Sequence, residues 1–339
     1  MKKIINEPAT VVVDALRGFE VAHADLVRVS YDPVFVVRAD APVRGKVALV
    51  SGGGSGHEPL HIGFVGPGML DAAVPGEVFT SPTPDQIVAA VRAVGGGAGV
   101  LLIVKNYTGD VLNFELAAEM ALAEGIEVRT LVVADDVVAQ RGVAGTLVVE
   151  KILGAAAAGG ADLETCLEIG RHVASHAFSI GVALEAGTVP HVGSPGFVLG
   201  PAEVEYGVGI HGEPGHERQE LRPARALVEG MASEVAVQLP VGRGDRVLVL
   251  TNGMGGTPPV ELYLAHGIAE RSLVEHWGVV VERRLVGSFV TSLEMRGLSI
   301  TVVVLDGARI FLPEERSRLA RLVEWWDAPV RTAALRWGM

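Results

Sequence analysis

One histidine, His57, stands in a run of glycines and small polar residues, SGGGSGHEP, at positions 51–59. The apolar run 46–50 directly before it is typical of a short buried strand. A glycine-rich turn after that strand would bring the imidazole to the carboxyl end of the strand, where α/β sheets build their sites. Imidazole gains and loses a proton near neutral pH, so the motif predicts acid–base or nucleophilic chemistry. A glycine turn with an incidental histidine is the alternative from this motif alone.

Three familiar motifs share parts of this pattern and are excluded by single residues. A phosphate-binding P-loop needs Lys and then Ser or Thr after its last glycine, where this chain has His57 and Glu58. A dinucleotide-binding fingerprint needs a glycine at position 57. The residues from His57 to His61 match the zinc-protease pattern HExxH, which requires a continuous helix, but Pro59 is tolerated only in a first helical turn. We therefore predict that the chain binds no metal.

A second group of ionisable residues, Lys105-Asn-Tyr-Thr-Gly-Asp110, follows the apolar run 100–104. By the same geometry, Lys105 and Asp110 lie at the carboxyl edge of a neighbouring strand and converge with His57 on one crevice. Spacing alone leaves two interpretations of Asp110. It caps the helix that begins near residue 111, or it acts as a general base toward a hydroxyl group.

Between these motifs, the proline-rich loop 75–84 carries paired hydroxyl groups. Ser81 or Thr83 is expected to cap the following helix, because prolines mark the start of that helix. A hydroxyl group that faces the pocket is the functional alternative.

The second half of the chain presents another histidine, His211, in the sequence GVGIHGEPG at 207–215. Glycines on both sides let a ligand approach the backbone and leave one face of the imidazole open, although the motif alone is an ambiguous turn histidine. Further on, a glycine turn at 253–256 could bind phosphate through its amides or could pack a helix on the sheet. Because no lysine follows it and no acidic pair is placed for Mg²⁺, we expect no ATP site there.

Composition bounds the class of protein and its partners. The chain has 339 residues, of which 49% are hydrophobic and 20% charged, and its formal net charge is −12. Length suggests two globular domains, and the negative charge argues against binding to nucleic acid or to anionic membranes. With Cys166 as its one cysteine, the chain cannot form an intrachain disulfide, which favours a reducing, cytoplasmic location. Neither a signal peptide nor a membrane-spanning run is expected.

The elements that must position these residues follow from hydrophobic periodicity. In the first half, apolar runs alternate with helical patterns, which predicts parallel strands with crossover helices and hence an α/β fold. The expected strands of this half are 46–50, 100–105 and 128–133, and its expected helices are 84–94, 113–124 and a long stretch at 145–176. The strands expected in the second half are 178–184, 207–210, 246–250, 279–286 and 300–305.

Glycines and prolines cluster near residues 185–195, which predicts a domain boundary there. We therefore expect two α/β domains, each with a mostly parallel or mixed sheet flanked by helices. Residues 1–187 carry the His57 loop and Asp110, and residues 188–339 carry His211.

Five segments, taken together and in order, resemble the substrate-binding subunit of dihydroxyacetone kinase, DhaK. These segments are SGGGSGHEP (51–59), PGEVFTSPTP (75–84), KNYTGD (105–110), GVGIHGEPG (207–215) and WDAPV (326–330). The resemblance covers nearly the whole chain and is more specific than any single glycine pattern. Two departures stand out: the loop after Asp135-Asp136 is shorter than is usual in the family, and 313–322 adds a charged, helical insert.

The resemblance implies a role for each site residue. His211 corresponds to the histidine whose Nε2 adds to the ketone of dihydroxyacetone and holds it as a hemiaminal. Asp110 corresponds to the general base that takes the proton from the attacking hydroxyl, and His57 to an assisting acid or base. The residues expected to line the substrate pocket are Gly54, Ser55, Gly56, His57, Lys105 and Asp110.

The resemblance also implies partners. The chain itself needs no cofactor, and no helical nucleotide domain is expected in it. It resembles the separate subunit that works with a nucleotide-binding subunit, DhaL, which carries Mg-ADP or Mg-ATP and is rephosphorylated by a phosphotransferase-system protein. A homodimer is expected. The alternatives are a non-catalytic paralogue that acts as a ligand-responsive transcriptional coregulator, and a kinase subunit for another short ketose such as erythrulose.

Overall fold

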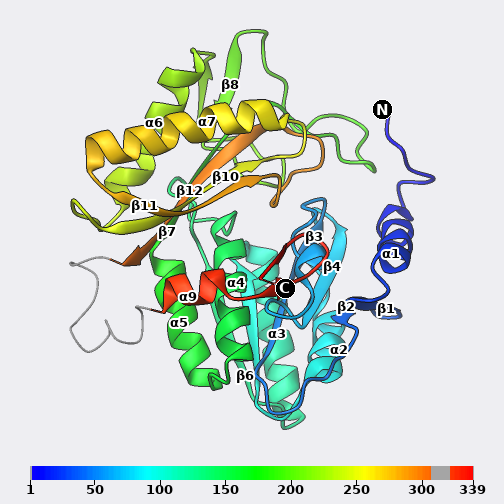
Figure 1. Cartoon of the computed structure of the whole chain (residues 1–339). Coiled ribbons are helices and arrows are strands. Elements are labelled where there is room, and N and C mark those ends of the chain that lie inside the picture. Colours follow the sequence, from blue (N-terminus) through cyan, green and yellow to red (C-terminus); the bar gives the residue numbers. More distant parts are fainter. Residues whose placement is uncertain (1, 307–320, 339) are drawn as a thin grey trace.

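The structure, a computed structural model, describes residues 2–306 and 321–338, and these residues form two six-stranded sheets with flanking helices (Figure 1). The predicted α/β class is confirmed. The predicted helical insert at 313–322 falls outside the described residues except for its last two positions. In the described part of the chain, every helix is too short or too polar to span a bilayer.

The first sheet has a parallel core extended at one edge by an antiparallel hairpin. Its strand order is β1-β2-β4-β3-β5-β6, and β4, β3, β5 and β6 run parallel. The strands are β1 (Val27–Tyr31), β2 (Val34–Arg38), β3 (Ala48–Ser55), β4 (Ala72–Val78), β5 (Val100–Lys105) and β6 (Val128–Val133). Successive strand residues point to opposite faces, so each face has its own apolar cluster. Helices α2 (Pro84–Val94) and α3 (Thr108–Ala123) cover one face, and α4 (Gly145–Ala158) and α5 (Leu163–Ser175) cover the other.

The second sheet is mixed, with the order β11-β10-β12-β7-β8-β9 and one parallel pair, β10 with β11. Its strands are β7 (Ala177–Glu185), β8 (Glu203–Tyr206), β9 (Glu217–Glu220), β10 (Arg246–Gly253), β11 (Val280–Gly287) and β12 (Arg296–Asp306). Helices α6 (Ala224–Gln238) and α7 (Pro259–Ser272) cover one face, followed by a π-helical turn at Leu273–Trp277. A first helix, α1 (Val11–Ala22), lies beside β1 (Figure 1).

Helix α4 lies between the two sheets and joins their cores. Every residue of α4 from Gly145 to Ala157 is buried. Its apolar side chains belong to one cluster with Leu49 of the first sheet and with Leu248 and Val303 of the second. The two sheets therefore share a helical layer.

The chain returns to the first sheet after β12. Helix α9 (Leu322–Asp327) packs on α4, where Lys151 Nζ donates to the carbonyl of Trp325 at 2.8 Å. A small hairpin, β13 (Val330–Arg331) with β14 (Arg336–Trp337), follows. There the amide of Ala334 donates to the carbonyl of Gly63 at 2.9 Å.

The glycine run before His57 is part of a strand, which corrects the predicted turn. Strand β3 continues to Ser55, and its glycines pair with β4, for example Gly54 with Gly76. The reason is close approach: a Cβ at Gly54 would lie 2.6 Å from the amide nitrogen of Thr80. Glycine is required here because the backbone of the next loop occupies the space of a side chain.

Other predicted elements keep their type but change their bounds. Helix α3 begins at Thr108, earlier than the predicted 113. The predicted helical stretch 145–176 is two helices, because Gly160 takes a positive φ of 87° and Asp162 caps α5 by accepting from the amide of Thr165. The strand predicted at 207–210 is wrong; β8 ends at Tyr206.

The chain enters the second sheet before the predicted domain boundary between residues 187 and 188. Strand β7 already pairs with β12, and α9 with its hairpin packs back on the first-sheet side. The boundary between independently folding units stays a prediction.

Gly54→Ala should destabilise the fold, because the added methyl group meets the backbone of Phe79 and Thr80 at 2.6–2.7 Å. Such overpacking typically costs about 1–3 kcal/mol. Gly18→Ala is the matched control, since Gly18 lies inside α1 with nothing within 4 Å of the added atom and should be neutral or stabilising. Urea unfolding measures both, and equal stabilities for the two variants would contradict the close-approach argument.

Candidate active site

The ends of β3 and β5 bring the predicted residues together. His57 follows β3, Lys105 is the last residue of β5, and Asp110 lies in the first turn of α3. His211 reaches the same place from the second half of the chain, in the loop between β8 and β9. All four side chains meet where the two halves touch.

His57 and His211 form the centre of the site. Their Nε2 atoms are 3.1 Å apart, and the rings meet edge to face with centroids 4.5 Å apart. His57 Nδ1 lies 2.8 Å from the carbonyl oxygen of Thr291, which can only accept. This assigns the proton of His57 to Nδ1, so its Nε2 accepts the proton that His211 carries on Nε2. Nδ1 of His211 is buried and has no hydrogen-bond partner among the described residues.

Both imidazoles are held in the neutral form. Burial, then the nearby His211 and Lys105, lowers the pKa of His57 well below its usual value. Burial, followed by the charges of Lys105 and Arg141, lowers the pKa of His211 to about 3. A neutral imidazole keeps a lone pair available, so the pair can exchange a proton and attack an electrophile at neutral pH.

Aromatic rings enclose the histidine pair. Phe79 stacks on His57 with centroids 5.1 Å apart and meets the edge of His211 at 5.5 Å. Tyr107 packs against His211 at 4.2 Å. Gly56 makes room for Phe79, because a Cβ there would lie 2.8 Å from the Phe79 ring. These rings supply the apolar surroundings that keep the imidazoles uncharged.

Lys105 is fully buried and its ammonium group faces three acceptors. Its Nζ lies 2.8 Å from the carbonyl oxygen of Gly52, 3.0 Å from Nε2 of His61 and 3.3 Å from Oδ2 of Asp110. An ammonium group has three donors, so each of them has a partner. The ion pair with Asp110 balances a charge that would otherwise be costly at this depth.

Asp110 is a buried base candidate and does not cap α3. The helix begins at Thr108 after the N-cap Tyr107, so the capping interpretation is wrong and Asp110 sits in the first turn, where the helix dipole favours its negative charge. Its Oδ1 accepts a hydrogen bond from the hydroxyl of Ser81. Ser81 therefore bonds the candidate base, while Thr83 is the N-cap residue of α2.

His61 and Glu150 extend the site inward, and the sequence did not assign them to it. His61 Nε2 accepts from Lys105, so its proton is on Nδ1 and is donated to Oε1 of Glu150 at 2.6 Å. Burial lowers the pKa of His61 well below its usual value and raises the pKa of Glu150 to about 8. The spacing of HExxH carried the signal, since it places a second histidine beside the glycine run.

No HExxH helix forms, because the residues from 57 to 61 are turns followed by a short 3₁₀ helix at Ile62–Phe64. Among residues 2–306 and 321–338, no group of three or more His, Cys, Asp or Glu side chains is arranged to hold a metal ion.

The remaining predicted pocket residues act through the backbone. Ser55 donates its hydroxyl to the carbonyl of Gly76 at 2.7 Å, which ties β3 to β4. Gly54 and Gly56 lie under the Phe79 loop. Their direct contact with substrate stays a prediction.

Comparisons with known proteins identify the family of this chain. A family model described as the Dak1 domain matches residues 17–334. The chain belongs to the Dak1 domain family. It is 44% identical to the PEP-dependent dihydroxyacetone kinase, dihydroxyacetone-binding subunit DhaK, of Escherichia coli K12, with both chains covered completely. It is 50% identical to the DhaK subunit of PTS-dependent dihydroxyacetone kinase 1 of Listeria innocua, over 90% of this chain and 95% of that protein.

Solved structures of Dak1 relatives have the same fold. The dihydroxyacetone kinase of C. freundii superimposes with a TM-score of 0.85 at 37% identity, covering 99% of this chain and 60% of that chain. The dihydroxyacetone kinase operon co-activator Dha-DhaQ superimposes with a TM-score of 0.87 at 30% identity, covering 97% and 98%. Proteins described as a kinase and as an operon co-activator therefore share this fold.

Glu150→Gln should make stability less sensitive to alkaline pH. The pKa of Glu150 is about 8 in the folded chain and near 4.5 when unfolded, so between these values the unfolded state binds fewer protons and stability falls as pH rises. Glutamine keeps an oxygen for His61 and does not titrate. Relative to the wild type, the variant should gain up to roughly 1.4 kcal/mol per pH unit from pH 5 to 8.

Urea unfolding at several pH values measures this difference. Glu115→Gln, at an exposed position of α3, is the control and should follow the wild type. A difference between Glu150→Gln and the wild type that stays constant with pH would contradict the assignment.

Proposed function

We propose that this chain is the dihydroxyacetone-binding subunit of a phosphotransferase-system-dependent dihydroxyacetone kinase. The E. coli and Listeria relatives are described as dihydroxyacetone-binding subunits DhaK of PEP-dependent and PTS-dependent dihydroxyacetone kinases. The match covers nearly the whole length of both proteins. The observation that carries the proposal is the neutral pair His57–His211, with Nε2 atoms 3.1 Å apart, beside the buried Lys105–Asp110 ion pair. One pair suits capture of a ketone, and the other suits activation of a hydroxyl group.

The two histidines can account for every proton that moves when the ketone is captured. As Nε2 of His211 bonds to the carbonyl carbon, its proton passes to Nε2 of His57, and the carbonyl π electrons move to the oxygen. His57 then returns the proton to that oxygen. The product is a neutral hemiaminal that contains every atom of both reactants, and Nδ1 of His211 needs no proton in it. Glycerol has no electrophilic carbon and is rejected.

Phosphoryl transfer then uses the other pair. Asp110 accepts the proton of the substrate hydroxyl as that oxygen attacks the phosphoryl group of the donor. The hydroxyl of Ser81 bonds one carboxylate oxygen of Asp110 and Lys105 pairs with the other. These two contacts fix the orientation of the carboxylate. Phosphoryl transfer depends mainly on positioning and charge, so the donor Mg-ATP can lie on a partner subunit, DhaL.

We infer that this chain carries no nucleotide cofactor itself. The glycine turn at 253–256 supports this view, because two of its amides are already bonded within the protein. Met254 donates to the carbonyl of Gly297 and Gly256 to that of Met295. A Cβ at Gly253 would lie 2.9 Å from Leu262 of α7, which supports the other interpretation of this turn, the packing of a helix on the sheet.

The rival function is that of a ligand-responsive coregulator. The structural similarity to the Dha-DhaQ co-activator supports this alternative. Asp110 favours the kinase, because a sensor needs capture but no base for a hydroxyl group. Erythrulose stays an alternative substrate. A homodimer and a cytoplasmic location stay predictions from the resemblance and from the single cysteine.

His211→Ala should abolish capture of dihydroxyacetone. Native mass spectrometry of the wild type with dihydroxyacetone should show the chain heavier by one substrate molecule. His216→Ala, an exposed histidine of the same loop, is the control and should keep the adduct. An adduct that survives His211→Ala, or phosphorylation of dihydroxyacetone by this chain with ATP and no partner, would contradict the proposal.

Asp110→Asn should separate the two steps. Asparagine retains an oxygen for Ser81 but cannot accept the substrate proton, so capture should persist while kcat with the partner subunit falls by about 10²–10⁴. Asp85→Asn, an exposed acid in the first turn of α2, should turn over normally. Turnover of Asp110→Asn at the wild-type rate would remove Asp110 from the role of base.

A further inference from the structure

The loop that carries His211 has little regular structure to hold it. Between the end of β8 at Tyr206 and the start of β9 at Glu217, the chain contains four glycines, and Gly207 and Gly212 take positive φ angles of 72° and 73°. Such a segment has many accessible conformations. Specific contacts must therefore keep His211 Nε2 within 3.1 Å of His57.

One carboxylate, that of Glu213, folds back onto the backbone of this loop. Its Oε2 accepts from the amide of His211 at 2.7 Å, and its Oε1 accepts from Nη1 of Arg141 at 3.2 Å. A Cβ at Gly209 would lie 1.8 Å from Oε1 of Glu213. The glycine at 209 therefore leaves the space that the carboxylate occupies.

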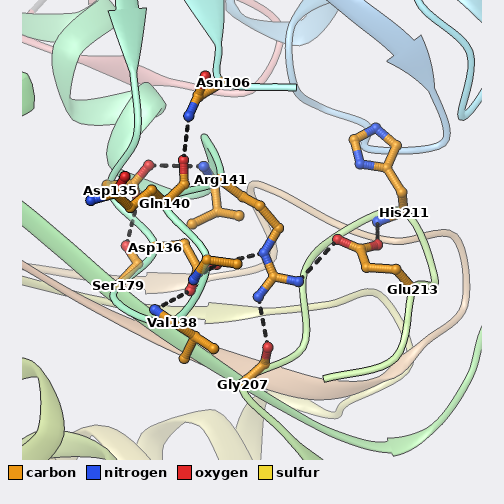
Figure 2. A network of polar contacts seen from close by, with 12 residues as sticks. Asn106, Asp135, Asp136, Val138, Gln140, Arg141, Ser179, Gly207, His211 and Glu213 are labelled. Carbon is orange, nitrogen blue, oxygen red and sulfur yellow. Dashed lines mark hydrogen bonds and ion pairs between the residues drawn. The ribbon is translucent and has the colours of Figure 1, made fainter. Parts of the chain in front are cut away.

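The guanidinium group of Arg141 holds both sides of the loop (Figure 2). Besides Glu213, it donates from Nη2 to the carbonyl of Gly207 at 2.6 Å, and its Nε pairs with the carboxylate of Asp136. A planar guanidinium can make these three contacts at once, which a lysine ammonium at the end of a flexible stem cannot reproduce.

Arg141 is itself fixed by a tight turn at the junction of the two halves (Figure 2). Asp136 accepts from the amides of Val138 and Ala139, and its own amide donates to the carbonyl of Arg141 at 3.0 Å. Asn106, just after β5, donates to the carbonyl of Gln140 at 2.8 Å. The resemblance implies that this turn is shorter than is usual in the family.

We propose that Arg141 and Glu213 form a latch that positions His211 for capture of the ketone. The proposal rests on the proposed function, because positioning matters only if His211 attacks. Neither latch residue is assigned a contact with substrate; both act through the backbone and surroundings of His211. The latch crosses from the first-sheet half to the second, so it also sets the distance between the two histidines.

The latch explains two chemical properties of His211. The amide bond to Glu213 fixes the backbone from which the imidazole projects. The guanidinium charge nearby is one of the causes, after burial and Lys105, that lower the pKa of His211. A loosened loop would expose the ring and allow it to become protonated, and a protonated imidazole cannot attack a carbonyl group.

The test compares Glu213→Gln, Arg141→Lys and the double variant with the wild type. The His211 amide and Arg141 bond different oxygens of Glu213, and glutamine replaces one of these oxygens with an NH2 group that cannot accept, so one of the two donors loses its present acceptor. Loss of a charge-assisted contact should weaken capture and raise KM roughly 10- to 100-fold, with kcat at saturating substrate changed by less than about threefold. The double variant should be no worse than the more impaired single variant, because both act through one contact.

Glu205→Gln is the matched control. Glu205 is a buried acid that accepts from the amide of Gly215, at the far end of the same loop, and has no bond to His211. Its KM should stay at the wild-type value. Thermal unfolding of every variant separates a positioning effect from general destabilisation, which would affect Glu205→Gln as well.

A second readout follows the imidazole of His211 directly by NMR titration, with its signals assigned by their loss in His211→Ala. The ring should remain neutral at pH 5 in the wild type and should titrate nearer pH 6 in Glu213→Gln and Arg141→Lys. Wild-type KM together with an unshifted titration in Glu213→Gln overturns the latch. If Arg141→Lys does not fold, Glu213→Gln decides, since its side chain is 30% exposed. If the wild type does not capture dihydroxyacetone, the proposed function is contradicted. The titration of His211 still tests the latch in that case, because it needs no substrate.

Discussion

A single buried ammonium group, that of Lys105, sets the conditions for the rest of the site. A charge at this depth is stable only with a complete set of partners, and three acceptors from three parts of the chain supply it. Gly52 contributes a carbonyl from the glycine strand, His61 an imidazole nitrogen and Asp110 a carboxylate. The ammonium group thereby fixes the position of the candidate base, the tautomer of His61 and the course of β3.

The histidine pair follows a different physical rule. Its reactivity depends on the absence of charge, which aromatic packing and burial provide. The polar Lys105 cluster and the apolar histidine pair adjoin each other, so we propose that one polarises a hydroxyl group while the other attacks a carbonyl carbon. Helix α4, which lies between the sheets, contributes Glu150 to the inner end of the Lys105 cluster.

The sequence predicted the chemistry of the site better than its local geometry. Strand ends placed Lys105, Asp110 and His57 together, since parallel strands present their carboxyl ends at one edge. The glycine run was mistaken for a turn, because glycine's conformational freedom is visible in a sequence and the approach of a distant loop such as Phe79–Thr80 is not. His61 and Glu150 were missed for a similar reason: their partners lie 44 and 89 positions away along the chain. The role of Arg141 depends on contacts 66 and 72 positions distant, which no local pattern reports.

The return of the chain to the first sheet bears on how this protein can reach its folded state. Lys151, buried in α4, finds its acceptor on Trp325, and the segment just after the His57 loop pairs with Ala334. Both partners are synthesised only after every strand of the second sheet. Until then, Lys151 and the carbonyl of Gly63 lack these native partners. Contacts of such long sequence separation slow folding. The His57–His211 pair, which draws on both halves, can therefore form only once the second half has been synthesised past His211 and has packed on the first.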